Sequence, residues 1–118
     1  MTGAFSTLLA ENEILVGLRI PKLSAAARWG HYKFCRKPGE FAEALGAVLV
    51  DPDRNICRAV IGATHGAPHV IEDARFITEG FDSERALAAV VAAGLGDDPY
   101  EKQIHHTALK RAALRLDA

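Results

Sequence analysis

Apolar and polar residues alternate with a period of two along the first part of the chain, and this period is typical of β-strands with one buried face. The clearest case is residues 13–20, in which every second residue from Ile14 to Ile20 is aliphatic. Proline has no N–H group to donate to a neighbouring strand, so we expect the strand to end before Pro21. The pattern therefore predicts a first strand over residues 13–20.

A second strand is predicted over residues 29–36, before the Lys-Pro-Gly sequence at 37–39 interrupts the extended pattern. Successive side chains of a strand point to opposite faces. One face of this strand then carries aromatic rings, and the other carries polar and reactive groups. The two sets are Tyr32 and Phe34 against His31, Lys33 and Cys35.

The next segments predict a hairpin. Residues 41–50 form an almost uninterrupted apolar run, and residues 56–61 follow as the partner strand. Between them, Asp51 followed by Pro52 is typical of a type I turn. Residues 62–68 contain too much Gly and Pro for a helix or a central strand, so we expect a loop there.

The spacing of apolar residues then changes to three or four, as in α-helices. A short helix is expected to present Val70, Ala74 and Ile77 on one face and to stop at Gly80. A second helix is expected to start at Asp82 or Ser83 as its N-cap and to end near two glycines. Those glycines are Gly94 and Gly96, and the predicted apolar stripe consists of Leu87, Val90, Val91 and Leu95.

The last helix has the strongest start signal in the chain. Asp98 is the expected N-cap, Pro99 the first helical residue and Glu101 the second partner of a capping box. Its predicted buried face consists of Ile104, Ala108, Ala112 and Leu116.

Strands followed by helices are typical of the α+β class. We predict a single domain over residues 1–118, with an antiparallel sheet of about three to four strands followed by about three helices packed on one face. A chain of 118 residues that is 49% hydrophobic buries enough surface to form a core without disulfides or metal ions.

The charge of the chain is nearly balanced, with 14 Lys and Arg against 15 Asp and Glu. We therefore expect neither nucleic acid nor an anionic membrane as a partner. No apolar stretch approaches the roughly 18 residues that a membrane span needs, and residues 1–5 lack the pattern of a signal peptide. These observations predict a cytoplasmic protein.

Five histidines raise the question of a metal site. His65 and His69 are four residues apart, but the Gly and Pro between them place both on a loop. His105 and His106 are adjacent on a helix and point about 100° apart, so they cannot both reach one ion. We expect surface or partly buried histidines and single out no metal ligand.

Two other groupings are candidates for chemistry. His31 and Cys35 share a strand face and form a conceivable nucleophile pair, but no nearby residue suggests an orienting carboxylate or an oxyanion loop. We therefore expect Cys35 and Cys57 to be buried thiols and single out no catalytic residue. The cations Lys33, Arg36 and Lys37 form either a site for an anionic or electron-rich ligand or a solvated strand end.

Several segments, taken in order, resemble one known family. They are residues 11–16 (ENEILV) with 19–21 (RIP), residues 32–37 (YKFCRK) with 39–42 (GEFA), residues 62–68, and the helix from 100 to 112. In this order they resemble the C-terminal domain of the FAD-binding (medium) subunit of molybdenum hydroxylases. These proteins include aerobic carbon monoxide dehydrogenases and the FAD segment of xanthine dehydrogenases. The resemblance extends from about residue 5 to residue 116.

The resemblance implies a role in electron transfer. In this family, electrons pass from a molybdenum centre through iron–sulfur clusters to FAD, which the protein positions and tunes. A lysine of the family's aromatic strand reaches the flavin ring, and Lys33 stands at the matching position. The resemblance also implies three partners, namely an FAD-binding N-terminal domain, a molybdopterin large subunit and an iron–sulfur small subunit.

The chain departs from the family pattern at several positions. The Gly-rich loops that hold the pyrophosphate of FAD belong to the N-terminal domain, which we expect to be absent from this chain. Residues 1–118 alone should then bind FAD poorly and be inactive. Glu40 stands where the family often has Asp, and Ala63 and Ala67 alter the loop over residues 62–68. The alternative function is a stand-alone interaction module that keeps the fold without flavin.

Overall fold

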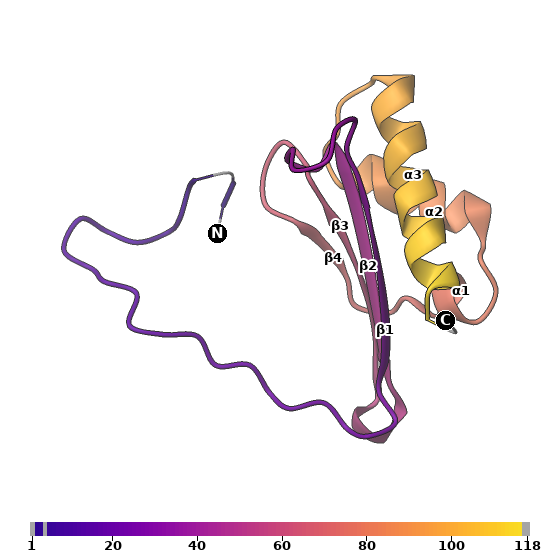
Figure 1. Ribbon diagram of the computed structural model, residues 1–118, viewed down its shortest axis with the longest axis horizontal. Coiled ribbons are helices and arrows are strands. Elements are labelled where there is room, and N and C mark those ends of the chain that lie inside the picture. The colour runs from indigo at the N-terminus through magenta and orange to yellow at the C-terminus, as the bar shows by residue number, and fades with distance from the viewer. Residues whose placement is uncertain (1, 4, 117–118) are drawn as a thin grey trace.

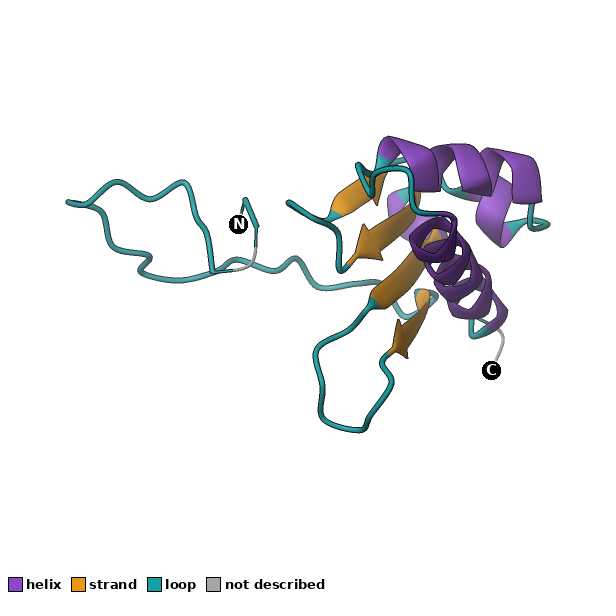
Figure 2. Cartoon of the chain, turned by 90° about the horizontal axis from the view of Figure 1, so that it is seen from above, coloured by secondary structure: helices purple, strands orange, loops and turns teal. Residues whose placement is uncertain are grey.

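The computed structural model describes residues 2–3 and 5–116. It contains a four-stranded antiparallel sheet with the strand order β1-β2-β3-β4. The strands are β1 (Arg28–Phe34), β2 (Ala44–Asp51), β3 (Ile56–Gly62) and β4 (His69–Ile71). The helices α1 (Arg75–Thr78), α2 (Ser83–Ala92) and α3 (Pro99–Leu114) lie on one side of the sheet (Figure 1, Figure 2). This architecture confirms the predicted α+β class.

The β2–β3 hairpin forms where the sequence predicts it. A short 3-10 turn, η1 (Pro52–Arg54), connects the strands, with Asp51 before it and Asn55 after it. Asn55 has a φ of 53°, a left-handed conformation that asparagine adopts more readily than most residues. The predicted turn between the two strands is therefore confirmed.

Gly30 and Gly46 allow α3 to lie directly on the sheet. A Cβ added to Gly30 would come within 2.3 Å of the carbonyl oxygen of Ala112, and one added to Gly46 within 2.7 Å of that of Ala108. Both distances are far below van der Waals contact, so a larger residue at either position would displace the helix. The backbone of α3 therefore approaches β1 and β2 closely.

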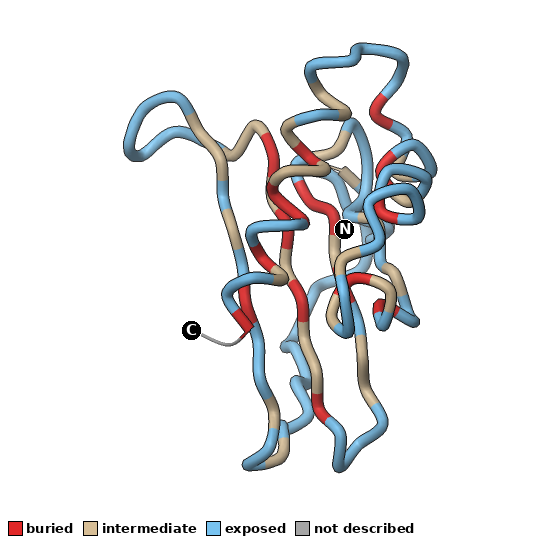
Figure 3. The backbone as a smooth tube through the Cα atoms, turned by 90° about the vertical axis from the view of Figure 1, so that its right-hand side faces the viewer, coloured by how far each residue is buried: buried red, intermediate tan, exposed pale blue. Residues whose placement is uncertain are grey.

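The hydrophobic core is formed jointly by the sheet and the helices, and buried positions fall on both (Figure 3). Its buried members are Val48, Ala59, Ile61, Ala74, Ile77, Ala86, Val90, Leu95, Leu109, Ala112 and Leu116. The stripe predicted for α2 is only partly right, because Leu87 and Val91 are 45% and 54% exposed. Ala86 is buried in their place, since a small side chain lets the helix approach its neighbours closely.

Both predicted N-caps are confirmed. The Asp82 carboxylate accepts hydrogen bonds from backbone N–H groups at the start of α2, and the Asp98 carboxylate accepts one from that of Tyr100. Glu101 does not serve as the predicted capping-box partner, because its carboxylate binds His65 instead. The attraction between the Glu101 carboxylate and the His65 ring on a neighbouring loop thus competes with the predicted capping box at the start of α3.

The buried face of α3 differs in part from the prediction. Ala108, Ala112 and Leu116 are buried as expected, but Ile104 is only half-buried. His105 and Leu109, which the sequence reading left out, are at most 1% exposed. The close contact at Gly46 sets this rotation, because a Cβ there would meet the backbone of Ala108 and Leu109.

The predicted first strand over residues 13–20 is wrong. These residues form no strand in the described part of the chain. They belong to an exposed segment, residues 5–27, which we call the arm. The arm leaves the start of β1 and runs on the side of the sheet opposite the helices (Figure 1, Figure 2). An alternating pattern produces a strand only where a sheet edge is available for pairing, and none lies beside these residues.

The strand β4 was not expected. Val70, predicted to begin a helix, instead pairs with Val60 of β3, and the helix begins only at Arg75. Three residues are too few for a period of two to be distinguished from a helical period.

The buried carboxylate of Asp51 fixes the root of the arm. It accepts hydrogen bonds from the hydroxyl of Ser24 at 2.5 Å and from its backbone N–H at 2.8 Å. The Ser24 bonds, together with the nearby Arg54, lower the pKa of Asp51 because they stabilise its charged form. The arm therefore departs from a fixed point beside the β2–β3 turn.

Candidate functional site

The side of the sheet opposite the helices is uncovered. Gly30, Tyr32 and Phe34 face α3, and alternate residues of a strand point to opposite faces, so the odd-numbered residues of β1 point away from the helices. The strand register extends this surface, which we call the open face, across the sheet. Its main side chains are Trp29, His31, Lys33, Leu45, Ala47, Leu49, Arg58, Val60 and Val70.

Lys33 lies on the open face near one end of the sheet, opposite Leu45 of β2. Its ammonium donates a hydrogen bond to the backbone carbonyl of Glu40, with 2.6 Å between Nζ and O. A carbonyl oxygen carries no net charge, so this bond fixes the side chain without neutralising it. The predicted separation of Lys33 from Tyr32 and Phe34 is confirmed, because those rings lie on the helix side.

The other cations of the predicted cluster do not share this position. β1 ends at Phe34, so Lys37 lies beyond the strand and does not share a strand face with Lys33. The Pro and Gly after Lys37 end the extended ladder. Arg36 forms an ion pair with Glu43, with 2.8 Å between Nε and Oε1.

The loop after β3 starts at the same end of the sheet as Lys33, because Lys33 and Gly62 flank the same residue of β2. Buried His105 holds the start of this loop, with Nε2 at 3.2 Å from the carbonyl oxygen of Gly62 and 3.1 Å from that of Ala63. Its Nδ1 lies 2.8 Å from the carbonyl oxygen of Glu101. Both ring nitrogens therefore bind backbone carbonyls.

An ion pair supports the same loop from outside. His65 Nε2 lies 2.9 Å from Glu101 Oε2. This hydrogen bond and the charge of the carboxylate raise the pKa of His65, because both favour the protonated ring. The Thr64 hydroxyl donates to the carbonyl of Ala67 at 2.9 Å. The loop thus forms a fixed border at the Lys33 end of the sheet.

The histidines and cysteines do not converge on one centre. Among residues 2–3 and 5–116, no group of three or more His, Cys, Asp or Glu side chains is placed to hold a metal ion. His31 stacks on Trp29, with 5.7 Å between the ring centroids. Cys35 lies beyond the end of β1 and so does not share a strand face with His31. Both thiols are half-buried, and Cys57 Sγ lies 3.2 Å from Thr78 Oγ1.

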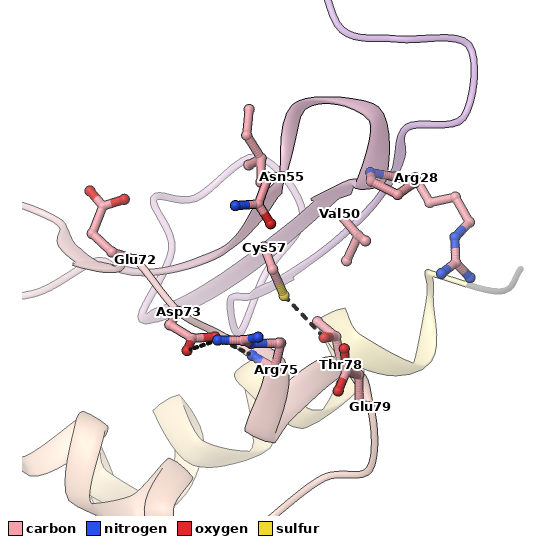
Figure 4. A pocket seen from close by; sticks show the side chains of 11 residues that line it. Arg28, Val50, Asn55, Cys57, Glu72, Asp73, Arg75, Thr78 and Glu79 are labelled. Carbon is pink, nitrogen blue, oxygen red and sulfur yellow. Dashed lines mark hydrogen bonds and ion pairs between the residues drawn. The ribbon is translucent and has the colours of Figure 1, made fainter.

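A cavity of about 500 Å³ lies at the other end of the sheet, beside α1 (Figure 4). The Arg75 guanidinium donates two hydrogen bonds to the Asp73 carboxylate there, from Nε to Oδ1 at 2.8 Å and from Nη2 to Oδ2 at 2.6 Å. The guanidinium lowers the pKa of Asp73 to about 2, and the carboxylate raises that of Arg75. Since this charge pair is satisfied within the chain and lies far from Lys33, we do not place the functional site here.

The open face is the part of the site that sequence reasoning missed. Its signal is the apolar run over residues 41–50, which is uninterrupted from residue 44 onward. Alternation with polar residues is expected when one face of a strand meets water, whereas a continuous apolar run is typical of strands covered on both faces. In the structure, Leu45, Ala47 and Leu49 are only half-buried. The composition of β2 thus indicates a second covering layer.

Comparison with known proteins identifies relatives of similar sequence. The chain is 32% identical over 96 residues to the carbon monoxide dehydrogenase medium chain of Hydrogenophaga pseudoflava. The matched region covers 77% of this chain and 33% of the relative. It is 30% identical over 130 aligned positions to the carbon monoxide dehydrogenase medium chain of Afipia carboxidovorans. This second match covers 98% of this chain and 45% of the relative. The chain therefore spans less than half the length of the curated relatives it matches. No family model matches the chain.

A solved structure shares the fold. It is the carbon monoxide dehydrogenase of Hydrogenophaga pseudoflava in a form that lacks the Mo-pyranopterin moiety of the molybdenum cofactor, with a TM-score of 0.65 and 24% identity. The match covers 97% of this chain and 45% of the other. In the described part of this chain, no helix has the length and apolar character to cross a membrane. The chain is homologous to part of the carbon monoxide dehydrogenase medium chain, which confirms the family resemblance seen in the sequence.

Proposed function

We propose that this chain is the C-terminal domain of the flavin subunit of a molybdenum hydroxylase and that it contributes Lys33 to the site that holds FAD. Homology to carbon monoxide dehydrogenase medium chains supports the subunit assignment. The observation that carries the role of Lys33 is its ammonium, fixed by a backbone carbonyl on an uncovered apolar sheet face. A fixed cation suits the edge of a ring system that becomes more negative on reduction.

The residues around Lys33 fit the ring part of FAD. Leu45 stands beside Lys33, and the next row across the sheet carries Ala47 and Val60. Aliphatic side chains on a sheet present a broad apolar surface to an aromatic ring, with the lysine charge at its border. The fixed loop that begins at Gly62 bounds the same end of the sheet.

The diphosphate of FAD does not fit this chain in the same way. Anions are commonly held by free N–H groups at a helix N-terminus. In α3 the Asp98 carboxylate already accepts from the N–H of Tyr100, and in α2 Asp82 accepts from that of Glu84. We therefore assign the diphosphate to the remainder of the subunit, so that the isolated chain binds FAD weakly.

When bound, FAD supplies the redox chemistry, taking electrons from the molybdenum and iron–sulfur centres and passing them to an acceptor. Lys33 keeps a positive charge at the border of the open face, because its partner is the neutral carbonyl of Glu40. This charge favours the more negative, reduced cofactor. Leu45 and Ala47 are apolar, so a ring packed on them would exclude water from the neighbouring surface and strengthen the effect. We assign no proton transfer to this chain.

The proposal includes the partners that the family resemblance implies. These are an FAD-binding N-terminal domain, a molybdopterin large subunit and an iron–sulfur small subunit, in an arrangement similar to that of xanthine dehydrogenases. The oxidised substrate binds at the molybdenum subunit in such enzymes, so we assign no substrate to this chain. A cytoplasmic location stays a prediction, as does the expectation of no nucleic-acid or membrane partner.

The test uses a hybrid subunit, in which this chain replaces the matched segment of the Hydrogenophaga pseudoflava medium chain. FAD is titrated into the hybrid and into the isolated chain, and binding is followed by flavin fluorescence. We expect saturable binding by the hybrid and no micromolar binding by the isolated chain. A folded hybrid that binds no FAD would contradict the proposed function, and micromolar binding by the isolated chain would contradict the division of the site.

A second candidate function is an interaction module without flavin. The exposed apolar open face favours it, because a large uncovered apolar patch commonly marks a contact surface. The gene neighbourhood separates the candidates. Adjacent genes for molybdopterin and iron–sulfur subunits favour the flavin subunit, whereas an isolated gene favours the module.

A further inference from the structure

We propose that the open face and residues 14–20 of the arm form one continuous interface, and that the remainder of the flavin subunit covers it by pairing a sheet edge with residues 14–20. The inference rests on the proposed function, since it takes that remainder as the occupant. It adds the surface through which this chain joins the rest of the subunit.

The first observation is the state of the arm. Ile14, Val16, Leu18 and Ile20 alternate like the residues of a strand, yet each is at least 82% exposed. Residues 14–23 make no backbone hydrogen bond with the described part of the chain. A segment with a strand pattern and free backbone groups is a ready template for β-pairing with another sheet edge. We therefore infer that residues 14–20 become a strand when their partner is present.

The second observation is the open face itself. Trp29 is 63% exposed and Val70 is 47% exposed, although both stand on a folded sheet. Leu45, Leu49 and Val60 are half-buried on the same surface. Because β2 is apolar on both of its faces, its sequence matches that of a strand with a layer on each side. The helices supply one layer, and the other is missing from the described chain.

The third observation joins the two surfaces. The arm bows outward on the side of the sheet that the open face looks toward, and two views at right angles agree on this placement (Figure 1, Figure 2). The bonds between Ser24 and Asp51 fix the root of the arm beside the β2–β3 turn. One folded body placed against the sheet would therefore meet both the open face and residues 14–20.

The length of the relatives argues for the occupant. The chain accounts for 33% of one medium chain and 45% of another, so each relative has more than half of its length outside the matched region. That remainder is large enough to form a folded body with its own sheet edge. A second copy of this chain, or the arm folding back on its own sheet, are the other possible occupants, and the experiment distinguishes them.

The experiment is amide hydrogen exchange on the hybrid subunit and on the isolated chain. We expect the amides of residues 14–20 to exchange at unprotected rates in the isolated chain and on the order of a hundredfold more slowly in the hybrid. Amides of β2 and β3 report whether the domain is folded in each sample. Equal exchange of residues 14–20 in both folded samples would overturn the proposal.

Two valine substitutions provide a matched pair. Val16→Asp changes a residue that is 98% exposed on the arm, and Val91→Asp changes an exposed residue of α2, away from the open face. We expect Val16→Asp to remove the protection of residues 14–20 in the hybrid and Val91→Asp to retain it. The same loss with both variants would overturn the proposal.

The isolated chain gives a check that does not depend on the hybrid. Trp29 is the single tryptophan and lies on the open face, so iodide quenching of its fluorescence measures whether that face is covered. We expect full access to iodide and a monomer in sedimentation. If Trp29 is shielded in a dimer, a second copy of the chain covers the face. If Trp29 is shielded in a monomer, the arm covers it. Either result would overturn the proposal. FAD binding is read separately, so a protected arm in a hybrid without FAD rejects only the proposed function.

Discussion

The ammonium of Lys33 donates to the backbone carbonyl of Glu40, with 2.6 Å between Nζ and O. This bond ties the end of β1 to the connection that leads into β2. It also fixes a positive charge on the open face without an acidic partner at that contact. The side chain of Glu40 is engaged elsewhere, since its Oε2 accepts from the backbone N–H of Lys37 at 3.2 Å.

Gly46→Ala is expected to destabilise the domain. The added methyl group would lie 2.7 Å from the carbonyl oxygen of Ala108, so α3 must move away from the sheet. Overpacking of this kind costs about 1–3 kcal/mol in the free energy of unfolding, measured by urea denaturation. Gly17→Ala is the control, because nothing lies within 4 Å of its new Cβ. A Gly46→Ala protein as stable as the Gly17→Ala protein would contradict the close packing of α3.

His105→Leu is expected to lower the free energy of unfolding by about 1–3 kcal/mol. Leucine fills a space similar to that of histidine, but it cannot bind the carbonyls of Gly62 and Ala63, which are then left without their partner in a largely dry site. His106→Leu is the control, since His106 is only half-buried and its ring nitrogen contacts exposed Ser83. Equal stability of the two variants would show that His105 is not needed to hold the loop after β3.

The stability of the domain is expected to fall at acidic pH, in part through Asp51. The hydrogen bonds from Ser24 lower the pKa of Asp51 in the folded state below its ordinary value of 3.8. A lowered folded pKa stabilises the protein above the unfolded pKa, and this stabilisation is lost as pH falls through the folded pKa. Urea midpoints measured from pH 7 to pH 2 should therefore decline less steeply in Asp51→Asn.

Asp73 also contributes to the loss of stability at acidic pH, because Arg75 lowers its pKa to about 2. Asp73→Asn therefore serves as the parallel variant in the acid series. An Asp51→Asn protein with the same acid profile as the unsubstituted chain would contradict the role of the Ser24 bonds. Loss of the dependence only in Asp73→Asn would assign it to the exposed pair with Arg75.

The pair of His65 and Glu101 has the opposite pH dependence. Glu101 raises the pKa of His65 above its ordinary value of 6.5, so the pair stabilises the loop below about that pH. This stabilisation is lost as pH rises through the raised pKa. An NMR titration should show the His65 pKa returning toward 6.5 in Glu101→Gln and staying raised in Glu84→Gln. An unchanged His65 titration in Glu101→Gln would contradict the ion pair.

Local chemistry accounts for what the sequence predicted well. The caps at Asp82 and Asp98 and the turn after Asp51 each depend on a few adjacent residues, and all three form. The face of β1 that carries Lys33 also follows from alternation alone. These features need no knowledge of distant parts of the chain.

Contacts between distant residues account for the rest. The rotation of α3 depends on Gly46 of the sheet, and Glu101 leaves the predicted cap for His65, which lies 36 positions earlier. The pattern of residues 13–20 identifies a strand-forming segment but not its partner. The bond from Lys33 to Glu40 depends on how residues 35–43 turn back, which alternation cannot show.

The most direct test of the account is the flavin reduction potential of the hybrid subunit with Lys33→Met. Removing a positive charge near the ring would change the free energy of reduction by about 2 kcal/mol at an effective dielectric constant of about 20. For a two-electron couple, this corresponds to a potential lower by roughly 40 mV. Lys37→Met, which removes a cation beyond the end of β1, should lower the potential by clearly less. A potential in Lys33→Met equal to that of the unsubstituted hybrid would contradict the placement of Lys33 at the flavin.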